Sequence, residues 1–145
     1  MSRILLAWEL GAVFGHLGPF LMVAQRLIDR GHELHIAARE IAGAVAAVGD
    51  LPIAVHQAPL CLNVYGGLQE PPLNYAEILM RYGYLDRAML RGLLTGWRSL
   101  LRVTDADLLI ADHAPTALIA ALLEGVPRAV IGTPFSVPPD THPSP

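Results

Sequence analysis

The sequence predicts an α/β fold with a doubly wound, Rossmann-like parallel sheet of about five strands, and three observations carry that prediction. Short apolar runs alternate with helical runs along the 145 residues. The apolar runs are continuous, which is typical of strands that are covered on both faces of a parallel sheet. Glycine or proline stands at many of the boundaries. Right-handed crossovers between such strands favour the order 3-2-1-4-5, with helices on both faces.

The first strand and the first helix are expected at residues 2–8 and 18–29. The strand is a short apolar run. The helix is indicated by apolar side chains at a spacing of three and four residues, namely Phe20, Val23, Ala24, Leu27 and Ile28. Pro19 suits the first turn of this helix, and Gly31 suits its C-terminal stop.

The middle of the chain predicts a strand at residues 33–38, an alanine-rich helix at 39–48 and a strand at 51–57. Residues 58–72 are expected to form a loop, because they contain Gly66, Gly67, Pro71 and Pro72. Residues 74–104 have a helical composition, and their glycines at positions 83, 92 and 96 favour two helices over one.

The last elements are expected to be a strand at residues 107–111, a helix at 115–124 and a strand at 128–131. Residues 1–134 would then form one Rossmann-like domain. Residues 135–145 are proline-rich and are expected to form a tail or linker.

Composition excludes several classes of function. The net charge of −3 makes nucleic acid and anionic membranes poor partners. Lysine is absent, which excludes a P-loop lysine and a Schiff-base lysine. Cys61 is the single cysteine, so a disulfide framework or thiolate zinc site is not expected. No apolar run reaches the length of a membrane span, and the N-terminus lacks a leader pattern. A soluble, cytoplasmic protein is therefore expected.

Two ionisable residues are expected to meet at one edge of the sheet. His16 follows the first strand, and Asp112 follows the fourth. These strands are neighbours at the point where the strand order reverses, and ligands collect beyond their carboxyl ends. A histidine beside an aspartate is a common general-base arrangement. The alternatives are a capping or loop role for His16 and an N-cap role for Asp112.

The glycines after the first strand also suggest a dinucleotide-binding turn, and the spacing argues against it. Gly11, Gly15 and Gly18 give G-x-x-x-G-x-x-G instead of G-x-G-x-x-G, and Phe14 lies inside the turn. Glu40 stands where a ribose-binding acid would be expected. A nucleotide-binding or flavodoxin-like module is therefore disfavoured, and no bound cofactor or metal is expected.

Four short motifs resemble the GT-B glycosyltransferases of the UDP-glycosyltransferase type. Residues 15–19, GHLGP, resemble their G-H-x-x-P motif, and residues 30–34, RGHEL, resemble the R-G-H-E-V start of their second strand. Residues 109–112, LIAD, resemble the end of their fourth strand, and residues 125–127, GVP, resemble the G-(I/V)-P before the fifth. Order and separation agree up to about Pro134. The resemblance therefore implies that residues 1–134 form an acceptor-binding domain that is incomplete relative to that of the family.

The resemblance implies roles for particular residues. His16 would be the base that deprotonates a hydroxyl acceptor, and Asp112 would hold that histidine. The oxygen would attack a nucleotide sugar with inversion, without a metal. The candidate acceptor-binding residues that line the crevice are Glu9, Phe14, Tyr65, Tyr75, Met80, Tyr84 and His113. For Glu9, a contact with the acceptor and a pair with Arg128 are both open.

The chain departs from that family in its length. Family members bind the donor mainly with a C-terminal domain, and no such region follows here. The chain alone is therefore expected to be inactive and to need a donor-binding domain or subunit. An alternative is a non-catalytic interaction or partner-subunit domain that keeps the fold. Exposed apolar surface is expected to drive self-association.

Overall fold

A computed structural model describes residues 1–11, 14–68 and 70–132 of the chain. The strands are β1 (Arg3–Trp8), β2 (Glu33–Ala38), β3 (Ile53–Gln57), β4 (Leu108–Asp112) and β5 (Arg128–Val130). The helices are α1 (Leu17–Asp29), α2 (Ile41–Val48), α3 (Tyr75–Leu79), α4 (Arg87–Val103) and α5 (Pro115–Glu124). Two short turns, the 3-10 turn η1 (Phe14–His16) and the π-helical turn η2 (Met80–Tyr84), precede α1 and follow α3. The proline-rich residues 135–145 lie outside the described residues.

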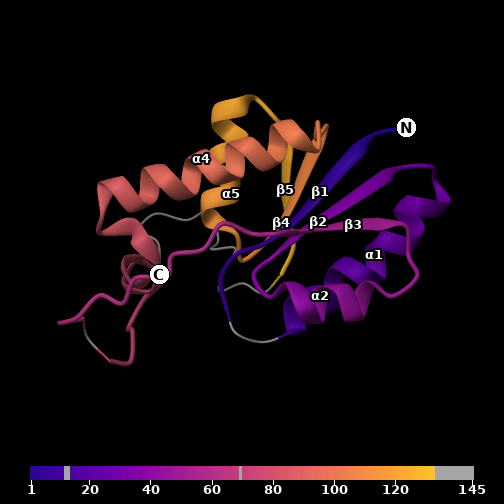
Figure 1. Ribbon diagram of the computed structural model, residues 1–145. Helices are drawn as coiled ribbons and strands as arrows, with labels where there is room; N and C mark the ends of the chain where they lie inside the picture. The colour runs from indigo at the N-terminus through magenta and orange to yellow at the C-terminus, as the bar shows by residue number, and fades with distance from the viewer. Residues whose placement is uncertain (12–13, 69, 133–145) are drawn as a thin grey trace, which may run out of the picture.

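The strands form one parallel sheet in the order β3-β2-β1-β4-β5, which confirms the predicted topology. Helices α1 and α2 cover one face of the sheet, and α4 and α5 cover the other (Figure 1). The central pair is β1 and β4, whose register joins Ile4 to Leu108 and Trp8 to Asp112. The carboxyl ends of these two strands therefore lie side by side.

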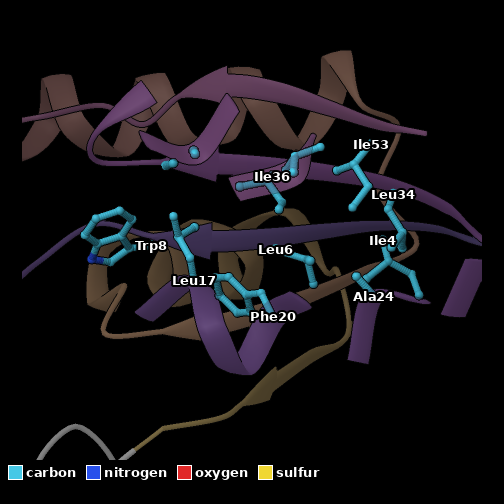
Figure 2. Close-up of a cluster of buried hydrophobic side chains, with 12 residues drawn as sticks. Ile4, Leu6, Trp8, Leu17, Phe20, Ala24, Leu34, Ile36 and Ile53 are labelled. Carbon is cyan, nitrogen blue, oxygen red and sulfur yellow. The ribbon is translucent and has the colours of Figure 1, made fainter. Parts of the chain in front are cut away.

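Two apolar cores hold the layers together. Between the sheet and α1 and α2, alternate residues of β1 and β2 pack against Leu17, Phe20 and Ala24 of α1 (Figure 2). On the other face, Leu5 and Ala7 of β1 pack with Trp97 and Leu101 of α4. The same core contains buried alanines and a leucine from β2, β4 and α5, namely Ala37, Leu109, Ala111, Ala117, Ala120 and Ala121. The period-two division of each central strand between these cores explains its continuous apolar sequence.

The sheet is covered on both faces, as predicted, but its two edge strands are less buried than its central strands. All three residues of β5 are exposed, and β3 is buried only at Ile53. The buried strand residues of the two cores come from β1, β2 and β4, with Ile53 from β3. Within the described ranges, none of the helices has the length and apolarity needed to cross a bilayer.

The helix boundaries follow local chemistry. The region 74–104 divides at Gly83, whose φ of 98° marks a kink inside η2, whereas Gly92 and Gly96 lie inside α4. Asp86 begins α4 by accepting hydrogen bonds from the backbone N–H groups of Ala88 and Met89. The division into two helices is therefore confirmed, with one of the three glycines responsible for it.

Candidate functional site

The structure brings His16 and Asp112 together, as predicted. The Nδ1 atom of His16 lies 3.2 Å from the Oδ2 atom of Asp112, whose side chain is 5% exposed, while that of His16 is 22% exposed. His16 ends the η1 turn directly before α1. Asp112 is the last residue of β4, and it does not cap α5, because the cap position belongs to Ala114.

The geometry assigns different tasks to the two ring nitrogens of His16. An imidazole that donates its Nδ1–H group to a carboxylate presents the lone pair of Nε2 as a base. Nε2 lies against Gly11, where a β-carbon built on that residue would be 2.5 Å away. Gly11 also has a φ of 87°, so the turn depends on glycine both for its backbone and for this close approach.

Aromatic rings surround the His16 imidazole. The Trp8 ring stacks on it with centroids 5.6 Å apart, and the His113 ring lies at the same distance on a tilted plane. The indole N–H of Trp8 donates to the carbonyl of Leu10 and so fixes the end of β1. These contacts restrict the orientation of the His16 ring.

His113 adjoins the pair from the turn between β4 and α5. Its φ of 50° is in the left-handed region, which is uncommon for a residue other than glycine. The backbone N–H of Leu10 donates to the His113 carbonyl at 2.9 Å. Burial, followed by the nearby His16, lowers the pKa of His113, while Asp112 opposes this shift. A neutral imidazole at this position is the consequence near neutral pH.

Glu9 lies at the same edge with its side chain buried. The residue is 2% exposed, and its Oε2 atom accepts a hydrogen bond of 2.9 Å from the backbone N–H of Thr116. Its Oε1 atom accepts from the Thr116 hydroxyl. Glu9 therefore pairs with the first turn of α5, whereas Arg128, the partner considered from sequence, is on β5. Burial raises the pKa of Glu9 to about 7, against the lowering effects of the Thr116 bonds and Arg39.

Two of the predicted tyrosines join this cluster. The Tyr84 hydroxyl lies 3.0 Å from Oγ1 of Thr116, and the Tyr75 ring lies 5.8 Å from the His113 ring. Burial and the neighbouring Glu9 raise the pKa of both phenols, so both keep their protons at neutral pH. Neither contact identifies an acceptor, and acceptor binding stays a prediction for Glu9, Tyr75, Tyr84 and His113.

The remaining candidate residues lie elsewhere or outside the described part. Tyr65 lies in the loop after β3, with its hydroxyl 3.9 Å from the Cys61 sulfur. Met80 is half-buried at the start of η2. Phe14 belongs to η1, and its side chain lies outside what the structure describes. Their acceptor-binding role stays a prediction.

Sequence reasoning missed Thr116 and Arg39. Thr116 is fully buried and joins Glu9 to Tyr84. Arg39 donates to the Glu9 carbonyl from the end of β2, and its guanidinium lies 5.4 Å from the centroid of the Tyr82 ring. A threonine directly after Pro115 was the one available signal, because hydroxyl residues are common where helices begin.

Glu40, the candidate ribose acid, is engaged at the start of α2, where both of its oxygens accept backbone N–H groups of the first turn. In the described ranges, histidine, cysteine, aspartate and glutamate side chains form no group of three suited to a metal ion.

An open apolar groove of about 440 Å³ lies between α1 and α2, lined by Leu17, Gly18, Leu21, Gly43, Ala46 and Ala47. These residues carry no ionisable group, so the groove is separate in chemistry from the His16 cluster.

Comparison with known proteins places the fold among GT-B glycosyltransferases. MurG from Acinetobacter baumannii superposes with a TM-score of 0.63 and 15% identity, over 90% of this chain and 35% of MurG. The glycosyltransferase VinC, solved with dTDP, superposes with a TM-score of 0.54 and 23% identity, over 87% of this chain and 33% of VinC. A UGT transferase from Siraitia grosvenorii, solved with UDP, superposes with a TM-score of 0.58 and 15% identity, over 90% of this chain and 27% of that transferase.

These likenesses concern the fold, and the chain spans about a third of the length of the proteins it resembles. No family model matches the sequence. No curated protein matches it in sequence either. The comparisons therefore establish a shared fold and no activity for this chain.

Proposed function

We propose that this chain is the acceptor-binding part of a glycosyltransferase that uses a nucleotide sugar, with His16 as the base. The observation that carries the proposal is the 3.2 Å contact between His16 and Asp112 beyond the carboxyl ends of β1 and β4. Ligands of doubly wound sheets bind at this edge. The shared fold with GT-B glycosyltransferases supports the same class of reaction.

In the proposed reaction, Nε2 of His16 takes the proton from an acceptor hydroxyl. The oxygen forms a bond to the anomeric carbon of the sugar as the bond from that carbon to the diphosphate breaks. The electron pair of the broken bond leaves with the nucleoside diphosphate, and attack from the opposite side inverts the anomeric centre. Asp112 stabilises the imidazolium that forms on His16.

The donor is proposed to bind to a second domain or subunit. The candidate site on this chain offers a base and aromatic walls, while both oxygens of Glu40 are occupied by backbone N–H groups. The chain alone is therefore expected to be inactive, and transfer is expected when a donor-binding domain is supplied.

The experiment joins residues 1–132 to the donor-binding part of VinC and measures transfer from dTDP-glucose to the hydroxyl probe 4-methylumbelliferone. His16→Ala is expected to lower turnover roughly 10²–10⁴-fold, which is the usual effect of removing a general base. His32→Ala is the matched control, because His32 lies before β2 and its Nδ1 accepts from the Ser2 backbone. Equal turnover in the parent and His16→Ala would end the assignment of His16.

A second candidate function is a non-catalytic partner domain, and one observation favours it. Apolar side chains are exposed on α5 and on the edge strand β5, namely Ile119, Leu122, Leu123 and Val130. Surfaces of this kind mark protein interfaces. Size-exclusion chromatography distinguishes the outcomes: self-association that Leu122→Glu abolishes would support an interaction surface, and a monomer at high concentration would contradict it.

A further inference from the structure

We propose that Glu9 is a positioning residue, which holds the His16–Asp112 pair through a tether made of Glu9, Thr116 and Tyr84. The tether lies beside the pair, and it connects β1, η2 and α5, which are far apart in the sequence. This role rests on the proposed function, because it assumes that His16 reacts. The tether is coupled to the tautomer of the His16 imidazole.

When Glu9 is ionised, the hydrogen bonds of the tether run in one direction. The Thr116 backbone N–H donates to one oxygen of Glu9, and the Thr116 hydroxyl donates its single proton to the other. The Tyr84 hydroxyl lies 3.0 Å from Thr116 Oγ1, so Tyr84 donates to Thr116. The donors therefore run from Tyr84 through Thr116 to Glu9, which is buried together with Thr116.

The tether supplies the N-terminal cap of α5 from a distant part of the chain. Helices begin with backbone N–H groups that have no partner in the helix, and a side chain of the cap residue usually accepts one of them. The cap position of α5 is Ala114, which has no side-chain acceptor. Glu9 accepts from Thr116 in its place, at a separation of 107 residues.

This cap fixes the turn that carries the partner of His16. Asp112 ends β4, His113 follows with its left-handed φ, and α5 begins two residues later. Leu10 holds the His113 carbonyl while Glu9 holds the start of α5. Glu9 and Leu10, the two residues after β1, thus hold both sides of the turn. Loosening the Glu9 contact is expected to release Asp112 from His16.

The charge of Glu9 makes the tether sensitive to protonation near neutral pH. The titratable groups that interact with Glu9 are Arg39 at the end of β2, Tyr75 of α3 and Tyr84 of η2. Asp112 at the end of β4 and His113 after it precede the start of α5, to which Glu9 bonds. An ionised carboxylate accepts both Thr116 bonds. A protonated one carries a hydroxyl on one oxygen, which competes with the Thr116 donors.

The test measures the tautomer of the His16 imidazole by nitrogen-15 NMR of the whole chain at pH 8.5. In the native chain the proton is expected on Nδ1, facing Asp112. Glu9→Gln and Thr116→Val are each expected to raise the Nε2–H population, and Thr116→Val does so without removing a charge. Thr104→Val is the matched control, since Thr104 is a buried threonine whose hydroxyl bonds to Leu100 on α4.

An unchanged His16 tautomer in both Glu9→Gln and Thr116→Val would overturn the proposal. If these two variants do not fold, Tyr84→Phe removes the outer donor alone and is measured in the same way, with the same two outcomes. The measurement requires no sugar transfer. A tautomer shift together with full turnover of His16→Ala would support the tether and reject the proposed reaction, and the two failures are therefore distinguishable.

Discussion

Two histidine–carboxylate contacts in this molecule have nearly the same length and very different surroundings. The site pair is His16 with Asp112 at 3.2 Å, and the edge pair is His35 with Glu33 at 3.3 Å. The Asp112 side chain is 5% exposed, whereas the Glu33 side chain is 52% exposed. The site pair lies at the carboxyl ends of two central strands, while both members of the edge pair lie on β2.

Contact distance alone does not make a histidine–carboxylate pair a candidate base. An exposed carboxylate is screened by water, so it holds its partner weakly. A buried carboxylate interacts more strongly with an imidazolium, because the surrounding dielectric constant is lower. In addition, the Nδ1 atom of His35 is engaged by His56 at 3.1 Å, whereas Nε2 of His16 faces Gly11. The site pair is the better candidate on both counts.

The largest predicted difference concerns turnover in the VinC fusion. Asp112→Asn is expected to lower it roughly 10²-fold or more, because the amide no longer fixes the Nδ1–H tautomer or stabilises the imidazolium. Glu33→Gln, the corresponding change in the edge pair, is expected to leave turnover unchanged. Steady-state kinetics measures both. Equal losses in the two variants would show that the site pair has no special role.

The pH dependence of stability separates the buried Glu9 from carboxylates that are exposed like Glu33. Folding raises the pKa of Glu9 from 4.5 to about 7, so the native state binds more protons than the unfolded state between these values. Stability contributed by Glu9 therefore falls as the pH rises through this window, by about 3 kcal/mol. Urea unfolding at pH 5 and pH 8 measures the change.

Glu9→Gln is the matched variant for that measurement, since it cannot ionise. Its free energy of unfolding should lose this component of the pH dependence, while Glu33→Gln should behave like the parent. A parent and a Glu9→Gln variant with parallel pH profiles would contradict the burial argument for Glu9.

The space beside Nε2 of His16 gives a smaller predicted effect. Gly11→Ala places a β-carbon 2.5 Å from Nε2 at a φ of 87°. Gly31→Ala is the control, because Gly31 has a φ of 80° and open space around its β-carbon position. Both should lose about 1 kcal/mol through backbone strain. Gly11→Ala alone should also shift the His16 imidazole resonances, and unchanged resonances would contradict the close approach.

The smallest predicted effect belongs to the surroundings of the edge pair. Burial and the neighbouring His35 lower the pKa of His56 below its ordinary value of 6.5. The native state therefore binds fewer protons at His56 than the unfolded state, and stability is lost as the pH falls below 6.5. The pH dependence of stability that His56 contributes therefore has the opposite sign to the one that Glu9 contributes. His56→Gln should weaken the loss, as measured by urea unfolding at pH 7.5 and 5.5, and an increased loss would contradict it.

Much of the fold was predictable because its signals are local. The apolar run before His16 and the run ending at Asp112 identify the two central strands, and the crossover rule makes them neighbours. The proximity of His16 and Asp112 followed from that topology and is confirmed at 3.2 Å. The boundaries moved by one or two residues: Asp112 belongs to β4, and Glu40 begins α2 as its cap.

The environment of Glu9 was not predictable from the residues around it. From sequence, a contact with the acceptor and a pair with Arg128 were equally open. The structure buries Glu9 against Thr116, at the start of a helix whose cap position is an alanine. The choice between partners depends on which side chains the packed layers bring into range, and no local pattern records it.

Three features follow from the sequence: the α/β class, the parallel order of the strands and the meeting of His16 with Asp112. They depend on hydrophobic periodicity and on the handedness of crossovers. Tertiary packing sets which carboxylates are buried, which nitrogen of His16 faces Asp112, and which strands are exposed. Those properties depend on side chains from distant segments that exclude water from one another, and burial of that kind exists only once the layers have packed.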